Sequence, residues 1–135
     1  MFVTRAGRHD RSDLKEFIEA HRGGEVDISE STAMIAREGS IVGCIRLIEV
    51  DSSTLVYDDV LVAENHDETV AKQLIQAAMN NKGGTIFTAV AAAETDLFSS
   101  FGFALIDRAE APEPVAEYWS SHQAASEGLV FLKAR

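Results

Sequence analysis

Residues 54–90 run TLVYDDVLVAENHDETVAKQLIQAAMNNKGGTIFTAV, and the order of elements in this stretch decides the fold class. The apolar stretches at 54–62 and 85–90 are typical of strands. Between them, apolar residues recur at helical spacing over 68–81, and a glycine pair follows. A strand, a helix and a strand of these lengths predict two parallel neighbouring strands joined by a right-handed crossover.

Shorter connections precede this stretch. Residues 33–37 and 41–50 are predicted to form a hairpin around a Gly-Ser turn, and 54–62 extends it into a meander. A strand at 2–4 and a helix over about 14–21 open the chain. The first half of the sheet is therefore expected to be antiparallel.

Beyond the crossover, the sequence predicts a mixture of short elements: a helix at 94–100, a strand at 103–107, a helix at 115–122 and a strand at 129–133. The whole order predicts an α/β (α+β) fold with a mostly antiparallel mixed sheet. A length of 135 residues is ordinary for one domain, so a single domain is expected over residues 1–135.

Composition narrows the class of protein. A formal net charge of −10, with its 12 basic residues scattered, argues against a nucleic-acid surface. No apolar run approaches the ~20 residues of a membrane span, and no apolar stretch follows the N-terminal basic residue as in a signal peptide. We therefore expect a cytoplasmic protein that does not bind membranes.

Metal and thiol chemistry are not expected. The spacing of the four histidines suggests no metal site. Cys44 is the one cysteine and lies in the apolar stretch IVGCI, so a small buried hydrophobic role is favoured over a reactive thiol.

Four stretches, in this order and spacing, together resemble the GNAT superfamily of acyl-CoA-dependent N-acyltransferases. They are VTRA at 3–6 with Asp13-Leu14, IVGCIRL at 41–47, DDVLV at 58–62 with AKQLI at 71–75, and LFSSFGF at 97–103. The segment from Gly102 to Leu132 is also similar to the short bacterial N-acetylglutamate synthase branch of that superfamily.

The resemblance implies a GNAT-like sheet, with helices on both faces and a central parallel pair that splays apart to admit acetyl-CoA. Backbone groups left without a partner strand would bind the pantetheine amides, and a helix N-terminus would bind the pyrophosphate. The implied cofactor-binding residues are Val60, Leu61, Val62, His66, Thr69, Val70, Ala71 and Phe98.

The loop before the second long helix departs from the family pattern. Thr69 stands where the family has its central glycine, and Asp67 and Glu68 bring carboxylates to the place of the phosphates. Acidic residues in a first helical turn are also ordinary helix stabilisers. One alternative is therefore a catalytically decayed GNAT-fold protein that acts as a ligand-sensing or protein-interaction module, and another is a homodimeric accessory protein.

Two residues of the strand at 54–62 are candidates for catalysis. Asp59 is the candidate base that takes a proton from the acceptor amine, although an aspartate here can also bond the local backbone. Tyr57 is the candidate acid for the leaving thiolate, because the family's usual tyrosine position holds Phe98; Tyr118 is a further candidate. The acceptor is expected to be a small-molecule amine.

The tail resemblance adds amino acids to the acceptors considered. An acceptor that carries a carboxylate would need a basic partner. Arg5, Arg37 and Arg46 are the candidates for this role.

Overall fold

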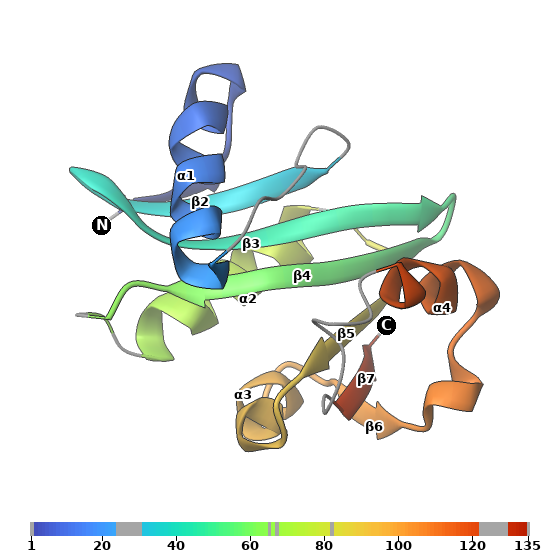
Figure 1. Cartoon of the computed structure of the whole chain (residues 1–135). Helices are drawn as coiled ribbons and strands as arrows, with labels where there is room; N and C mark the ends of the chain where they lie inside the picture. Colours follow the sequence, from blue (N-terminus) through green and yellow to red (C-terminus); the bar gives the residue numbers. More distant parts are fainter. Residues whose placement is uncertain are drawn as a thin grey trace. The chain divides into compact units, whose positions relative to one another are not determined.

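The computed structural model describes residues 2–23, 31–64, 66, 68–81, 83–121 and 130–134 (Figure 1). The strands are β1 (Phe2–Arg5), β2 (Thr32–Glu38), β3 (Ser40–Asp51), β4 (Thr54–Val62), β5 (Thr85–Val90), β6 (Ala104–Ile106) and β7 (Val130–Ala134). The α-helices are α1 (Arg11–Arg22), α2 (Glu68–Asn81), α3 (Thr95–Ser99) and α4 (Glu113–Ser120). Single 3-10 turns lie at η1 (Arg8–Asp10), η2 (Ala92–Glu94) and η3 (Arg108–Glu110).

Hydrogen bonding orders the strands β1-β2-β3-β4-β5-β7-β6. The neighbours β4 and β5 are parallel, whereas β1–β2, β2–β3, β5–β7 and β6–β7 are antiparallel pairs. This order confirms the mostly antiparallel mixed sheet with a central parallel pair. The elements β4, α2 and β5 have the bounds that the sequence predicts.

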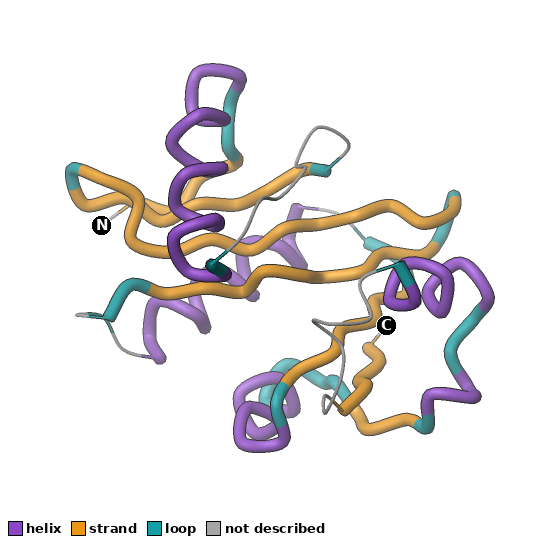
Figure 2. Tube along the Cα trace, viewed as in Figure 1, coloured by secondary structure: helices purple, strands orange, loops and turns teal. Residues whose placement is uncertain are grey.

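The chain forms two compact units, which are described separately. Unit 1 comprises residues 1–48 and 58–82, and unit 2 comprises residues 49–57 and 83–135. The strands β3 and β4, the two longest, are drawn in orange in Figure 2, and each contributes residues to both units. The expectation of one domain over the whole chain stays a prediction.

In unit 1, helices cover both faces of the strands, with α1 on one face and α2 on the other (Figure 1). Leu14 and Ile18 on α1 pack against Ala33 and Ile35 of β2 and against Cys44 of β3. The apolar periodicity of α1 produces this contact, because residues four apart in sequence lie on one helical face. The left-handed Gly23 ends α1, and its N–H donates to the Glu19 carbonyl at 2.8 Å.

On the opposite face, α2 packs close to β3 at Gly43. Its apolar residues Val70, Leu74 and Ala78 are buried, as the helical periodicity predicts. A Cβ atom at Gly43 would lie 2.9 Å from both Leu74 Cδ1 and Val70 Cγ1. The missing side chain therefore sets how closely this helix approaches the strand.

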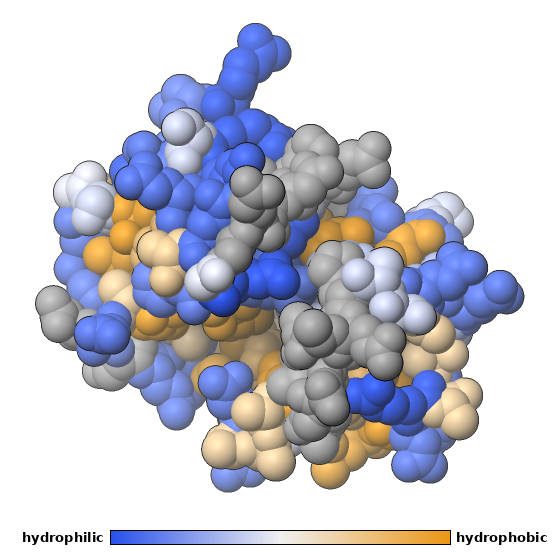
Figure 3. All heavy atoms as spheres, in the orientation of Figure 1, coloured by the Kyte–Doolittle hydropathy of each residue, from blue (hydrophilic) through white to orange (hydrophobic). Residues whose placement is uncertain are grey.

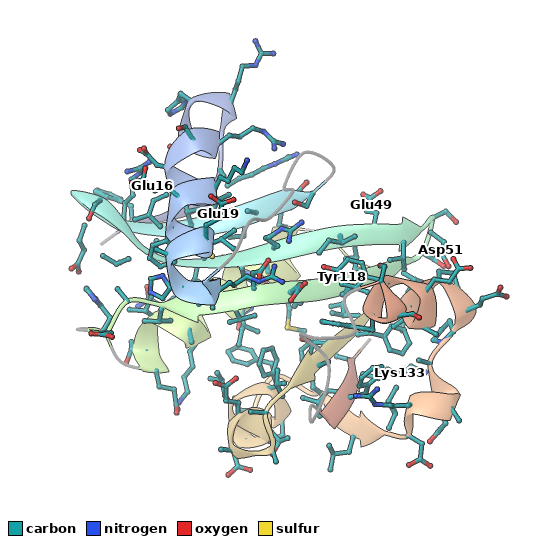
Figure 4. All side chains as sticks on the ribbon, viewed as in Figure 1. Glu16, Glu19, Glu49, Asp51, Tyr118 and Lys133 are labelled. Atoms are coloured by element: carbon teal, nitrogen blue, oxygen red, sulfur yellow. The ribbon has the colours of Figure 1, made fainter. Side chains whose placement is uncertain are left out.

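In unit 2, β7 lies between β5 and β6 and carries part of an aromatic core. Phe131 of β7 lies 6.0 Å from Trp119 of α4, measured between ring centroids. The guanidinium of Arg108 stacks over Phe131 at 4.8 Å from the ring centroid, which is within cation–π distance. Lys133 of β7 similarly places its ammonium 5.9 Å from the Phe87 ring centroid (Figure 4).

Element ends in unit 2 differ from those predicted. Helix α4 begins at Glu113 rather than 115, because Pro114 lies in its first turn, where a fixed φ suits a helix. The predicted helix end at His122 and strand start at Leu129 lie outside the described residues. Strand β6 spans only Ala104–Ile106, shorter than the predicted 103–107.

The outer surface of α1 is largely hydrophilic (Figure 3). This helix therefore has the two-sided character that the sequence predicts, with an apolar face on β2 and β3. Among the described helices, none combines the length and apolar character that a bilayer span requires.

Candidate functional site

The parallel ladder between β4 and β5 is shorter than the two strands. It begins at Thr54↔Thr85 and ends at Tyr57↔Thr88. At this last pair the Thr88 hydroxyl donates a hydrogen bond to the Tyr57 carbonyl at 2.9 Å. β4 then continues to Val62, and the remaining β5 residues pair with β7 on their other side. The two strands are therefore not paired over their full length.

The backbone changes conformation directly after the ladder. Asp59 has a φ of +52°, which is a left-handed value. Among the described residues it is the single non-glycine residue with a positive φ. Its N–H donates to the Asp58 carboxylate at 2.8 Å, which stabilises the irregular strand. The regular alternation that would place Asp59 on the same face as Tyr57 and Leu61 is interrupted here.

The Asp59 carboxylate lies in a buried cluster with two arginines of unit 1. Arg46 Nη1 donates to Oδ2 at 2.7 Å, and Arg22 Nη1 lies 3.2 Å from Oδ1. The side chains of Asp59 and Arg46 are only 4% and 6% exposed, whereas that of Arg22 is 25% exposed. Arg46 Nε also donates to Ser31 Oγ at 3.1 Å. Arg22 is thus the charged member of the cluster that solvent reaches.

Burial raises the pKa of the Asp59 carboxyl, and the nearby Asp58 charge acts in the same direction. Its contacts with Arg46 and Arg22 oppose this rise. A carboxylate with a raised pKa is a stronger base than an ordinary aspartate. The two arginines hold the Asp59 carboxylate in a fixed orientation.

Cys44 has the structural role that the sequence favours. Its side chain is buried, and its thiol donates to the Asp59 carbonyl at 3.3 Å. Burial raises the pKa of this thiol far above its ordinary value. The thiol is consequently a fixed contact beneath the irregular part of β4, without thiolate reactivity.

The predicted cofactor contacts on β4 and its following loop lie in unit 1. Val60, Leu61 and Val62 are half-buried at the end of β4. His66 follows them, and its Nε2 lies 3.0 Å from Glu38 Oε1, which holds the pKa of the Glu38 carboxyl below its ordinary value. The other ring nitrogen, His66 Nδ1, is buried and has no hydrogen-bond partner among the described residues.

The N-terminal turn of α2 contains the remaining loop candidates. Thr69 is exposed, whereas Val70 and Ala71 are buried against unit 1. The Glu68 carboxylate pairs with Lys72 at 3.1 Å, so its charge is partly neutralised along the helix. Asp67 lies outside the described residues.

Tyr57 and Phe98 belong to one aromatic cluster in unit 2. Both are almost fully buried, and Phe103 lies between them, at centroid distances of 6.2 Å from Tyr57 and 5.3 Å from Phe98. The Tyr57 hydroxyl is buried without a hydrogen-bond partner among the described residues, and burial raises its pKa. Tyr118 lies on α4 instead, with its ring against Trp119 (Figure 4).

The three basic residues considered for a carboxylate acceptor have separate positions. Arg46 contacts Asp59, whereas Arg37 pairs with Asp10 at 2.9 Å, and Arg5 lies on the edge strand β1. Sequence reasoning missed Arg22, because a basic residue in the last turn of a helix is commonplace. Among the described residues, no group of histidine, cysteine and carboxylate side chains could hold a metal ion.

Comparisons with known proteins give similarity in structure only. No protein-family model matches the sequence, and no curated protein is significantly similar to it. A GNAT-family acetyltransferase from Staphylococcus aureus Mu50 aligns with a TM-score of 0.71 and 16% identity, over 98% of this chain and 97% of that one. Rv2747 from Mycobacterium tuberculosis, solved in complex with CoA, gives a TM-score of 0.71 and 18% identity, over 99% and 98%.

N-acetylglutamate synthase from Neisseria gonorrhoeae, complexed with coenzyme A and L-arginine, is a further structural match. It aligns with a TM-score of 0.67 and 18% identity, over 99% of this chain and 33% of that chain. At such identities the similarity concerns the path of the backbone. The chain therefore has the fold of the GNAT acetyltransferases, which confirms the resemblance that its sequence motifs indicate.

Proposed function

We propose that this chain is an N-acetyltransferase that moves the acetyl group of acetyl-CoA to the amine of a small molecule, with amino acids among the acceptors. The observation that carries the proposal is the early end of the parallel ladder at Tyr57, after which β4 continues to Val62 without pairing to β5. Structures with the same fold contain CoA in the Mycobacterium tuberculosis and Neisseria gonorrhoeae proteins.

Residues of unit 1 would bind the cosubstrate. In the proposal, backbone groups of Val60, Leu61 and Val62 bond the pantetheine amides, and backbone N–H groups of the first turn of α2, at Thr69, Val70 and Ala71, bond the pyrophosphate. His66 Nδ1 supports this assignment: it is buried and finds no hydrogen-bond partner among the described residues, which is costly unless a further group completes it. The pairing of Glu68 with Lys72 weakens the repulsion expected from that carboxylate.

Asp59 and Tyr57 would perform the proton transfers. The acceptor nitrogen attacks the thioester carbonyl carbon, the C–N bond forms, and the C–S bond breaks with its electron pair on sulfur. Asp59 accepts the proton that the nitrogen loses, and the Tyr57 hydroxyl gives a proton to the thiolate; exchange with solvent then restores both groups. The predicted contact of Phe98 with the cosubstrate stays a prediction, because its ring is buried in the aromatic cluster of unit 2.

A thermal-shift titration with acetyl-CoA tests the proposal. Binding at 100 times the dissociation constant is expected to add about 2.7 kcal/mol to the free energy of unfolding. Asp59→Asn is expected to keep this shift and to lose turnover with a panel of amines. A flat titration up to millimolar acetyl-CoA would favour the decayed module instead, which the threonine at position 69 already suggests.

Localisation in the cytoplasm and homodimer formation stay predictions. Size-exclusion chromatography with light scattering measures the oligomeric state directly. A monomer at micromolar concentration would contradict the prediction of a homodimer.

A further inference from the structure

A cavity of about 390 Å³ lies in unit 1 between α1 and the turn that joins β2 to β3. Pockets that hold small molecules measure about 300–1,000 Å³, so this cavity has the size of a ligand site. Asp59 is not among the residues that line it. Both α1 and the β2–β3 hairpin contribute to its walls, with Asp13, Glu16, Phe17 and Ala20 from the helix and Arg37 and Ile41 from the hairpin.

The inner wall of this cavity is apolar. Ile41 is only 8% exposed, and Phe17 is half-buried against the core that Leu14 and Ile18 form with β2 and β3. Ala20 is exposed and extends the apolar wall along α1, because residues three apart lie on one helical face. The apolar part of a ligand would therefore be removed from water here.

The rim of the cavity carries negative charge. Arg37 pairs with the buried Asp10 at 2.9 Å, so its positive charge is already matched. Asp13 Oδ2 lies 3.5 Å from the same guanidinium, but the Asp13 side chain is 63% exposed. Glu16 is exposed, has no ion pair among the described residues and projects from α1 towards the turn (Figure 4). The two exposed carboxylates therefore favour a cationic ligand.

We propose that this cavity binds a small aliphatic polyamine, at a site separate from the candidate acetyl-transfer site. Asp13 and Glu16 are three positions apart on α1, so their Cβ atoms lie about 5–6 Å apart. An extended chain of three or four methylene groups separates two ammonium groups by roughly the same distance, since its bonds are near 1.5 Å. Each carboxylate receives one ammonium group, and the methylene groups lie against Phe17 and Ile41. This inference goes beyond the proposed function and does not depend on acetyl-CoA.

Calorimetric titration without acetyl-CoA tests the proposal, with the four-carbon diamine putrescine, butylamine and succinate as ligands. Putrescine is expected to bind and succinate not to bind. Butylamine should bind about twofold to fivefold more weakly than putrescine, because it loses one ion pair at an exposed rim. Added salt should weaken putrescine binding, since it screens exposed charges. No binding of putrescine at millimolar concentration, or equal affinity for butylamine, would overturn the proposal.

Variants on α1 locate the site. Glu16→Gln removes one rim charge and should weaken putrescine binding about twofold to fivefold. Ala20→Leu fills the cavity without a change of charge and should weaken binding at least as much, with little change in melting temperature because residue 20 is exposed. Glu117→Gln is the matched control, since it removes the same charge from an exposed position on α4. An equal loss in Glu117→Gln would show that putrescine responds only to the overall acidity of the protein, which contradicts the cavity site.

Asp59→Asn separates this site from the candidate acetyl-transfer site. Putrescine held in the cavity keeps its affinity in this variant, whereas putrescine held as an acetyl acceptor beside Asp59 loses affinity. Loss of binding in Asp59→Asn, with full binding in Glu16→Gln, would therefore refute the cavity site. A protein that fails to bind acetyl-CoA, but binds putrescine with the expected response to Glu16→Gln and Ala20→Leu, would contradict the proposed function alone.

Discussion

Gly43→Ala is expected to destabilise unit 1, because the new methyl group has no room between β3 and α2. The Cβ atom would lie 2.9 Å from Leu74 Cδ1 and Val70 Cγ1, and 3.2 Å from the Leu61 carbonyl oxygen. Leu74 is fully buried and Val70 is only 4% exposed, so neither side chain has space to move aside. The helix itself must therefore shift outward.

Overpacking of this kind costs about 1–3 kcal/mol. For a chain of this size, that loss lowers the melting temperature by roughly 4–12 °C. Circular dichroism during heating, together with urea unfolding, measures both quantities. Gly83→Ala is the matched control, since among the described residues, its chain neighbours aside, no atom lies within 4 Å of the added Cβ, and its φ is outside the left-handed range. It should leave stability unchanged or raise it slightly.

The same variant reports on the candidate cofactor site. Leu61 and Val70, both among the proposed acetyl-CoA contacts, are the neighbours that Gly43→Ala displaces. Acetyl-CoA affinity is therefore expected to fall together with the melting temperature, whereas Gly83→Ala keeps it. Wild-type stability for Gly43→Ala would refute the close approach of α2 to β3.

Two further predictions concern polar groups. Tyr57→Phe removes a buried hydroxyl that has no hydrogen-bond partner in the described chain, so the free energy of unfolding should stay equal or rise. If this hydroxyl protonates the thiolate, kcat for acetyl transfer should fall in the same variant. Asp10 accepts hydrogen bonds from the Gly7 N–H at 2.7 Å and from Arg37 at 2.9 Å, which hold the pKa of its carboxyl below the ordinary 3.8. Because the pKa of Asp10 is lowered in the folded state, its contribution to stability is complete above the ordinary value of 3.8 and is lost as the pH falls from there through the lower pKa of the folded protein. The difference between wild type and Asp10→Asn in urea unfolding should therefore shrink as the pH is lowered below about 3.8. A stability difference that does not vary with pH would contradict the Asp10 contacts.

The fold was more predictable from sequence than the site. Elements with strong periodicity, β4, α2 and β5, have the predicted bounds because their apolar residues face one core. The predicted start of α4 at residue 115 is wrong, because the pattern places Pro114 in a loop, whereas a proline suits the first turn of a helix. Helices and strands are predictable because their apolar spacing is set by residues close together in sequence.

The Asp59 cluster depends on contacts that no local pattern contains. Arg22 lies 37 positions from Asp59 in sequence, and Arg46 lies 13 positions away, so neither pairing follows from helical or strand spacing. The left-handed backbone at Asp59 is also unexpected, because strand alternation assumes extended residues throughout. Asp58 is the one local indication of an irregular strand, because its carboxylate can accept a hydrogen bond from the N–H of the next residue.

The contacts of Asp59 bear directly on the proposed function. An aspartate that only stabilised the fold would be served by Arg46 alone, whose contact at 2.7 Å already satisfies Oδ2 in a buried setting. The second guanidinium, that of Arg22, comes from the end of α1, and its side chain is 25% exposed. Asp59→Asn should lower kcat for every amine in the panel while the protein stays folded and still binds acetyl-CoA. Arg22→Gln removes the more exposed guanidinium and leaves the buried Arg46 contact, so it should lower the melting temperature less than Asp59→Asn does. An equal loss of turnover and stability in the two variants would show that the cluster serves the fold rather than the reaction.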